Sequence, residues 1–226
     1  MTVKTAIRLK FPYESSRCIV YSFKLTNSKE PSKKEIKVNG QILESVTKFK
    51  YLGSVISDEG SKPEILSRIA QTKTALTKLK PISNNKNIAI SSKIRLLRSL
   101  VMSIFLYACE SWTLNADIER RIRAMEMRCH RRLLGISYKD HTTNEEASRR
   151  IENAIGPHVD LLTIVCQRKL KWYGHTTRSS GLAKTIMQGT VNGGRRRGRQ
   201  KKRWDDNIRE WIGLELRNTL RKVEDR

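Results

Sequence analysis

The stretch "SKIRLLRSLVMSIFLYACE", residues 92–110, holds the longest apolar-rich segment of the chain and decides its fold class. Its apolar residues recur at spacings of three and four, which is typical of a helix with one buried face. The residues expected to face inward are Ile94, Leu97, Val101, Ile104, Phe105 and Ala108. The apolar segment Leu100 to Ala108 covers only about half of the ~20 residues that a membrane span requires. We therefore expect a buried helix from about Ser92 to Glu110.

Two further amphipathic segments flank this helix. Before it, Ser61 is a candidate N-cap with Glu64 as its capping-box partner, and Pro63 is tolerated in the first turn. After it, Asn115 caps a segment that stops near Gly135. The residues expected to face the core are Ile65, Ile69, Leu76 and Leu79 in the first segment, and Ile118, Ile122, Met125, Cys129 and Leu133 in the second. These three helices should form most of the core.

A small β element precedes the helices. In "EIKVNGQILESV", residues 35–46, apolar and polar residues alternate on both sides of Asn39-Gly40, the dipeptide favoured in two-residue hairpin turns. We expect "KFKYLGSVI", residues 48–56, to be a third strand. The predicted fold class is mainly α with a small antiparallel β-hairpin element.

The second half of the chain is also predicted to be helical. Thr143 and Glu146 form a candidate capping box for a helix that ends at Gly156-Pro157, and a further helix begins at Asp160 and stops near Gly174. Residues 182–191 are a strand candidate, and a last amphipathic helix begins at Trp204. We divide the chain into a lead-in (1–34), a hairpin element (35–60), a helical bundle (61–135), a second helical region (136–192) and a basic loop with a C-terminal helix (193–226).

The charge of the chain predicts a polyanionic partner. There are 46 Lys and Arg against 22 Asp and Glu, a formal net charge of +24, which exceeds what solubility requires. Seven cations, interrupted by glycine and glutamine, are concentrated in one run: Arg195, Arg196, Arg197, Arg199, Lys201, Lys202 and Arg203. Such a run can follow a phosphate backbone, and its alternatives are a nuclear-localisation signal or a solvated loop. Nearby, Trp172 and Tyr173 could stack on bases or be buried in the core.

The cysteines and histidines show no metal-binding spacing. Cys18, Cys109, Cys129 and Cys166 lie far apart, which favours reduced thiols and an intracellular protein. The four histidines form no pair at the spacing of structural zinc sites, and we expect Cys129 to be a core residue and His130 a surface residue. The alternative is a site assembled from residues distant in sequence. We therefore assign no metal ligand and no cofactor in this chain.

Several blocks resemble the reverse transcriptases of non-LTR, LINE-type retrotransposons. "FKYLGSVISDEG", residues 49–60, is similar to the stretch just downstream of the catalytic palm in that family. "LLRSLVMSIFLYACESWTL" and "RRIRAMEMRCHRRLLGI" resemble its helical thumb, and "RKLKWYGHTTR" with "GRRRGRQKKRWDDNIREWIG" resembles the region after the thumb. Together the blocks cover about residues 35–213, and their order makes the resemblance more specific than the three-letter YLG motif alone.

The resemblance implies a primer grip but no polymerase centre. In the family, the YLG strand positions the growing 3′ end, so the resemblance implies that role for Phe49, Tyr51, Leu52 and Gly53. The aspartate-bearing hairpin of the palm should precede residue 35, and residues 1–34 do not resemble it. Mg²⁺ is therefore expected only for a full-length parent enzyme.

One Asp-Asp pair could be mistaken for the missing centre. Asp205 and Asp206 follow the basic run at a predicted helix start, where acids favour the positive end of the helix dipole. Adjacent side chains on a helix diverge by about 100°, so the two carboxylates would not point at one metal site. We assign no catalytic residue.

The sequence thus predicts a reverse-transcriptase-like protein that binds RNA, DNA or an RNA–DNA hybrid and is inactive alone. The alternative is a basic helical nucleic-acid-binding protein with no link to reverse transcription. No membrane association is expected, an intracellular and, through the basic run, nuclear location is anticipated, and the sequence does not indicate an oligomeric state.

Overall fold

The computed structural model describes residues 46–179, 183–185 and 202–213 in full, together with the backbone of short strands between residues 4 and 45. The chain is mainly α-helical with small β elements, as the periodicities predicted. The helices are α1 (Lys62–Lys78), α2 (Lys80–Asn84), α3 (Ile90–Leu96), α4 (Ser103–Phe105), α5 (Ala116–Leu133), α6 (Asn144–Ile155), α7 (Leu161–Arg178) and α9 (Trp204–Ile212), with a π-helical segment η1 (Leu97–Met102) and 3₁₀ turns η2 (Cys109–Ser111) and η3 (Tyr138–Asp140).

The strands that the structure describes form three small sheets. β1 (Lys4–Ile7) pairs antiparallel with β2 (Ile19–Phe23), which pairs parallel with β5 (Glu44–Ser45), so the predicted lead-in contains strands. β3 (Lys37–Val38) and β4 (Gln41–Ile42) pair antiparallel across two residues, which confirms the predicted hairpin. β6 (Lys48–Tyr51) and β7 (Ser54–Ser57) form a second hairpin, so the prediction of one strand over residues 48–56 was wrong.

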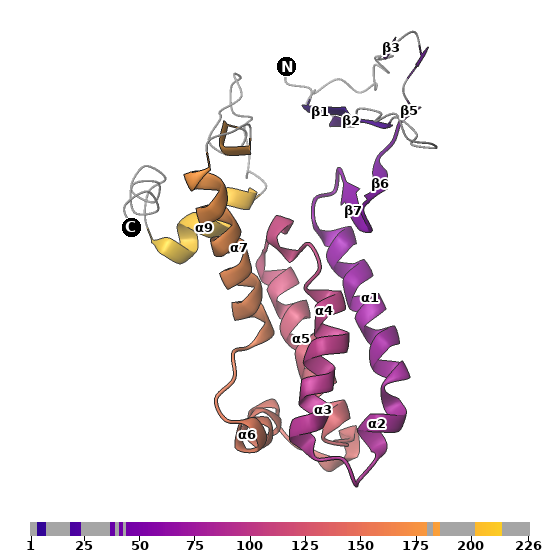
Figure 1. Ribbon diagram of the computed structural model, residues 1–226, viewed down its shortest axis with the longest axis vertical. Helices are drawn as coiled ribbons and strands as arrows, with labels where there is room; N and C mark the ends of the chain where they lie inside the picture. Colours follow the sequence, from indigo (N-terminus) through magenta and orange to yellow (C-terminus); the bar gives the residue numbers. More distant parts are fainter. Residues whose placement is uncertain are drawn as a thin grey trace.

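Three long segments form the bundle that holds the core. α1, the continuous α3–η1–α4 segment and α5 lie side by side, with the β6–β7 hairpin at one end and α2 near the other (Figure 1). The buried apolar side chains include nearly all those predicted to face inward: Ile65, Ile69, Leu76, Leu79, Ile94, Leu97, Val101, Phe105, Ile118, Ile122, Met125, Cys129 and Leu133. Trp112 is also buried and meets the ring of Phe105 edge-on, with 5.2 Å between ring centroids.

The middle segment differs from the helix predicted over residues 92–110. It begins at Ile90, passes through a π-helical segment, and ends at Phe105, since Ala108 adopts a left-handed conformation with φ of 56°. Ile104 and Ala108 are only half-buried. The change of direction after Phe105 lets Trp112 and Leu114 return to the core, where both are buried.

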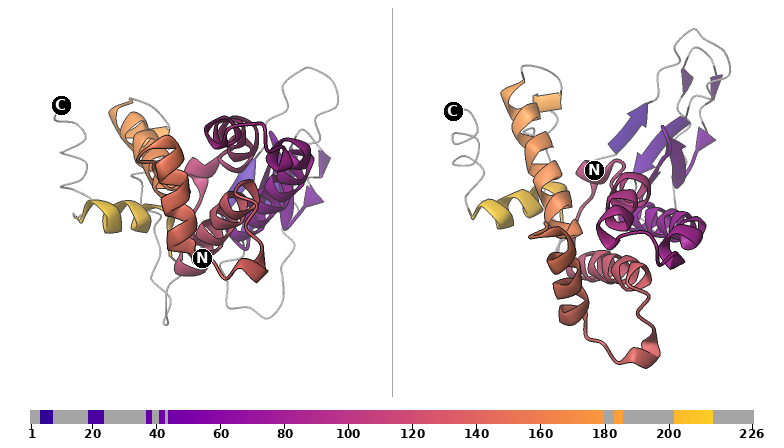
Figure 2. Two further views of the ribbon diagram at one scale, coloured as in Figure 1. Left: turned by 90° about the horizontal axis from the view of Figure 1, so that it is seen from below. Right: turned by 60° about the horizontal axis from the view of Figure 1, so that its bottom comes forward.

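The second helical region packs along the bundle. α7 lies beside α5, α6 packs across the far end of α5, and α9 crosses α7 near its C-terminal end (Figure 1; Figure 2). α7 continues through Gly174 to Arg178, so the predicted stop at Gly174 was wrong, and residues 183–185 are helical where a strand was expected. Within the described part of the chain, no helix is long and apolar enough to span a membrane.

Candidate nucleic-acid interface

The YLG motif forms the tip of the β6–β7 hairpin. Leu52 and Gly53 have φ of 46° and 85°, the positive values that a two-residue type I′ turn requires. Glycine adopts this conformation freely, whereas an L-residue such as leucine pays roughly 1–2 kcal/mol. Even so, the side chain of Leu52 is 74% exposed, and Tyr51 beside it is 44% exposed. An apolar side chain thus stands in solvent on a strained turn, and no packing against the described residues accounts for it.

Three side chains hold this turn in place, two from α1 and one from the turn that follows α4. Arg68 of α1 donates a hydrogen bond from Nη2 to the carbonyl oxygen of Gly53 (2.7 Å), and the hydroxyl of Tyr107 donates to the carbonyl oxygen of Leu52. Glu64 accepts from the backbone N–H of Val55 (2.5 Å) and from Nε of Arg68 (2.7 Å). Glu64 and Arg68 are both buried, and the Arg68 guanidinium lies over the Tyr107 ring. The turn is therefore fixed to the bundle before any partner binds.

This network corrects the capping-box prediction. Ser61 is the residue before α1, but its hydroxyl caps nothing in that helix and instead accepts from the backbone N–H of Thr113 (2.9 Å). Glu64 points to the hairpin. Sequence reasoning missed the roles of Arg68 and Tyr107, because Arg68 lies in none of the recognised blocks and nothing in the thumb-like block assigns a role to Tyr107. The signal available was an i,i+4 Glu–Arg pair on the inner face of a predicted helix, where charges require partners.

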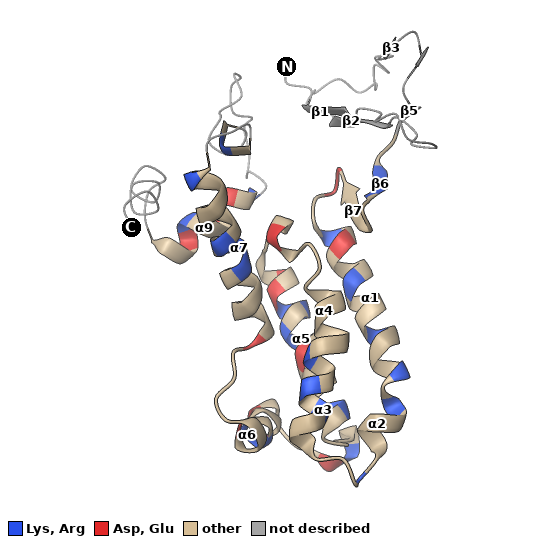
Figure 3. Cartoon of the chain, in the orientation of Figure 1, with Lys and Arg blue, Asp and Glu red and all other residues tan. Residues whose placement is uncertain are grey.

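A groove of about 630 Å³ starts beside the turn and runs between α1 and α4. Its lining combines Arg68 and Tyr107 with polar and cationic residues of α1, namely Gln71, Thr74 and Lys78. Lys and Arg recur along α1 and α3 with few acids between them (Figure 3). The exposed hairpin tip therefore overlooks a groove with cationic and hydroxyl-bearing walls.

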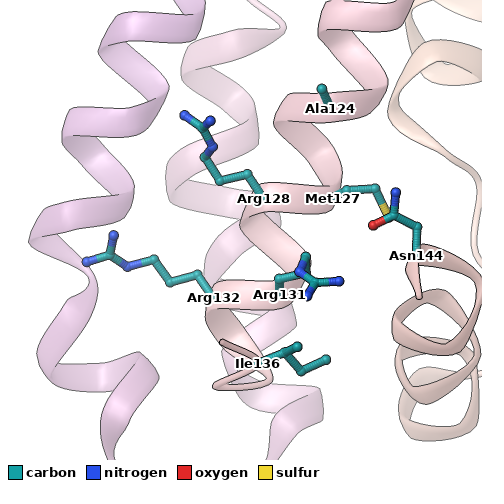
Figure 4. Close-up of a pocket in the computed structure, with 7 residues that line it drawn as sticks. All are labelled: Ala124, Met127, Arg128, Arg131, Arg132, Ile136 and Asn144. Carbon is teal, nitrogen blue, oxygen red and sulfur yellow. The ribbon is translucent and has the colours of Figure 1, made fainter. Parts of the chain in front are cut away.

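A second groove, of about 520 Å³, lies between α5 and α6. Its lining includes Met127, Ile136 and Asn144 and three arginines, Arg128, Arg131 and Arg132 (Figure 4). Arg131 donates to the carbonyl oxygen of Thr142 (2.7 Å), whereas Arg128 and Arg132 have no acidic partner among the described residues. This groove adds a second cationic surface.

The basic run lies mostly outside the described residues. Arg195, Arg196, Arg197, Arg199 and Lys201 fall there, while Lys202 and Arg203 immediately precede α9. Lys202 pairs with Glu210 (2.5 Å).

Asp205 and Asp206 stabilise the first turns of α9, as predicted from their position at the start of that helix. The Asp206 carboxylate accepts from the backbone N–H of Arg203 (2.6 Å), closing the first turn, and Asp205 pairs with Arg209 (2.7 Å) on the next turn. The two carboxylates are therefore engaged with different partners.

The aromatic residues of the two basic motifs pack against one another. Tyr173 is buried and Trp172 is 41% exposed, and both contact Trp204, whose Nε1–H donates to the carbonyl oxygen of Glu110 (2.8 Å). Of the two readings of these rings, burial holds for Tyr173, and only Trp172 retains an exposed face. The cluster joins α7 to α9.

A buried lysine and asparagine complete this junction. The Nζ of Lys169 donates to the carbonyl oxygen of Trp112 (2.8 Å) and to Oδ1 of Asn207 (2.9 Å), and it lies 4.5 Å from the centroid of the Trp204 ring. Asn207 also exchanges two hydrogen bonds with the backbone of Leu114, each 2.8 Å. Burial lowers the pKa of Lys169 to about 7. The junction thus fixes the start of α9, which directly follows Arg203, the last residue of the basic run.

His130 was expected at the surface but is buried. It contacts the ring of His158, with 5.5 Å between ring centroids, and it lies one helical turn after the buried Glu126. Burial is the main cause that lowers the pKa of His130 to about 4 and raises that of Glu126 to about 7. Sequence spacing could not reveal this group, since His158 follows His130 by a whole helix.

Comparison with known proteins gives one relevant similarity. No protein-family model matches the chain, and no solved structure matches it. An uncharacterized transposon-derived protein of Caenorhabditis elegans is 30% identical over 176 residues, which are 75% of this chain and 62% of that relative. Three quarters of the chain is thus similar to a protein described as derived from a transposon.

Proposed function

We propose that this chain is a retrotransposon-derived, reverse-transcriptase-like protein that binds the recessed end of an RNA or RNA–DNA duplex without extending it. The hairpin contacts the primer end, the bundle lies along the duplex, and the basic run binds phosphates. The similarity to a transposon-derived protein supports the origin. The ordered blocks of residues 35–213 support the more specific relation to LINE-type reverse transcriptases.

One observation carries the proposal. Leu52 is exposed in a left-handed conformation, while the carbonyl oxygens of Leu52 and Gly53 are fixed by Tyr107 and Arg68. Strain that the surrounding structure maintains is characteristic of functional positions. A rigid tip bearing an apolar side chain, above a groove lined by Lys78 and Arg68, suits contact with the terminal base and sugar of a strand whose phosphates follow the groove.

The test compares a recessed RNA–DNA primer-template with single-stranded RNA of the same length by fluorescence anisotropy. Leu52→Gly removes the side chain while relieving the turn, so the fold is kept. Losing one buried leucine contact of about 1.4 kcal/mol corresponds to about tenfold weaker binding to the recessed end. Binding to single strands should not change.

Tyr138→Ala provides the matched control, because Tyr138 is 86% exposed on η3 at the other end of the bundle. It should leave both affinities unchanged. Equal affinity of the native chain for recessed ends, blunt duplex and single strands would contradict the proposal and favour a general polyanion-binding protein.

A further inference from the structure

We propose that Glu126, His130 and His158 form a zinc-binding site that fastens the connection between α6 and α7 to α5. One ligand atom from each of the three residues lies within 4.8 Å of the other two. Glu126 and His130 stand one turn apart on α5, and His158 comes from the connection, residues 156–160. Two imidazoles and a carboxylate are a ligand set that zinc uses in proteins.

The burial of the two imidazoles points to a missing partner. His130 is 4% exposed, and the side chain of His158 is 9% exposed. The Nδ1 atom of each ring is buried without a hydrogen-bond partner. A buried polar nitrogen without a hydrogen-bond partner destabilises the folded state, and a cation bound to these two nitrogens would remove that penalty.

The third proposed ligand is already held in a fixed orientation. Glu126 uses Oε1 to accept from the backbone N–H of Leu161 (2.9 Å), which orients the carboxylate and leaves its other oxygen available.

The geometry requires only a small contraction. Ligand atoms around a tetrahedral zinc ion lie about 3.3 Å apart, so separations of up to 4.8 Å would close by roughly 1.5 Å through side-chain rotation. A carboxylate oxygen of Glu152 lies 4.0 Å from Nδ1 of His158 and could supply the fourth ligand, with water as the alternative. The positive charge of Arg98 is close enough to interact electrostatically with both Glu126 and His130. The Arg98 side chain is exposed, however, so solvent and ions screen its repulsion of a bound cation.

Zinc at this position would have a defined structural consequence. α5 belongs to the bundle, whereas α7 carries Lys169 and the aromatic junction with α9. A metal bound to His158 would fix the start of α7 to α5. It would thereby stabilise the position of α7, the long helix that precedes the basic run in the sequence. The site is independent of the YLG turn.

The test is titration of the purified, metal-free chain with Zn²⁺, monitored by competition with a chromophoric chelator and by thermal unfolding. One equivalent should bind and raise the melting temperature, and Mg²⁺, which prefers oxygen ligands, should do neither. His158→Asn and His130→Leu should each weaken zinc binding by about 100-fold or more, since loss of a ligand exceeds the 10–100-fold loss from a ligand's supporting partner.

A substitute variant and a control variant keep the test decisive. His130→Leu fits an apolar environment and should melt no lower than the native chain without metal; if it fails to fold, Glu126→Gln, which can still accept from Leu161, takes its place. His175→Asn changes an exposed histidine on α7 and should bind zinc normally. When Co²⁺ is bound in place of Zn²⁺, the absorption spectrum should show no thiolate charge-transfer band, because no cysteine is among the proposed ligands. Absence of binding, retention in the His130 and His158 variants, or such a band would overturn the site.

Discussion

At the scale of single residues, Lys169 shows how burial and hydrogen bonding compete. Burial lowers its pKa to about 7, while two carbonyl oxygens and an indole face stabilise its ammonium form. In the unfolded chain the amine would have its ordinary pKa of 10.5. Between these two values the unfolded state binds more protons, so raising the pH favours the folded state.

Lys169→Met therefore gives a testable pH dependence. The free energy of unfolding of the native chain, minus that of the variant, should be lowest and constant below pH 7. From pH 7 to 9 it should rise by up to about 1.4 kcal/mol per unit. Urea unfolding of both chains at pH 6, 7, 8 and 9 measures the difference, in which other titrating groups cancel. Parallel pH profiles would mean that Lys169 keeps its proton throughout.

Residue-scale prediction from sequence worked where a local rule applied. Asn115 and Thr143 were predicted as caps, and each accepts from the backbone N–H three residues on. Asp160, at the predicted start of a helix, does the same. Glu146 was predicted to complete a capping box with Thr143, but its side chain pairs with Arg149 and Arg150. Prediction failed where the partner is distant, as with Glu64, which accepts from the backbone N–H of Val55 on β7 instead of forming a capping box in its own helix. The proposed zinc ligands illustrate the same limit, because spacing rules detect ligands within one motif and not those that the fold brings together.

At the scale of elements, α9 shows what the Asp-Asp pair does. Asp206 closes the first turn through Arg203, and the partly exposed Asp205–Arg209 pair adds little. We expect Asp205→Asn with Asp206→Asn to cost about 1 kcal/mol of stability. Nucleic-acid binding should be equal or slightly tighter, because two negative charges are removed beside the basic run.

The double variant also tests the catalytic alternative. Neither the native chain nor the variant should extend a labelled DNA primer on an RNA template with Mg²⁺ or Mn²⁺. Primer extension by the native chain that disappears in the variant would show that the pair is catalytic after all.

Element boundaries were predictable when a breaker residue acted as expected. Gly135 and Gly156 end α5 and α6 with positive φ. Gly174 does not end α7: it lies buried within the helix, which continues to Arg178, and it is absent from the glycines with positive φ. The turn within "KFKYLGSVI" was missed because leucine is an uncommon residue at positive φ.

At the scale of the whole molecule, the net charge predicts binding dominated by phosphate contacts. If about six cations of the run each neutralise a phosphate, log K should fall against log salt with a slope of about −5 on duplex. Changing Arg195, Arg196, Arg197 and Arg199 to Ala should reduce the slope by about 3 to 4.

A matched variant distinguishes phosphate contacts made by the basic run from a general effect of the chain's net charge. Lys139, Arg149 and Arg150 lie on and before α6, where the two arginines pair with Glu146. Changing these three to Ala should leave the slope nearly unchanged. An unaltered slope in the quadruple Arg variant would show that the run does not contact nucleic acid.

The fold class followed from sequence because three strongly periodic helices supply the core. The way α7 and α9 join this core did not, since it depends on Lys169 and Asn207, residues usually expected at the surface. The proposed interface shares this division: the YLG motif was recognisable, and its attachment through Arg68 and Tyr107 was not.

The most direct measurement of the central claim is site-specific photo-cross-linking from position 52. A benzophenone amino acid replaces Leu52 in one protein and the exposed Tyr138 in another, and each is irradiated with an end-labelled recessed RNA–DNA hybrid. The account predicts cross-links from position 52 within a few nucleotides of the primer 3′ end, and few from position 138. Cross-links from position 52 spread evenly along the duplex, or equal to those from position 138, would contradict it.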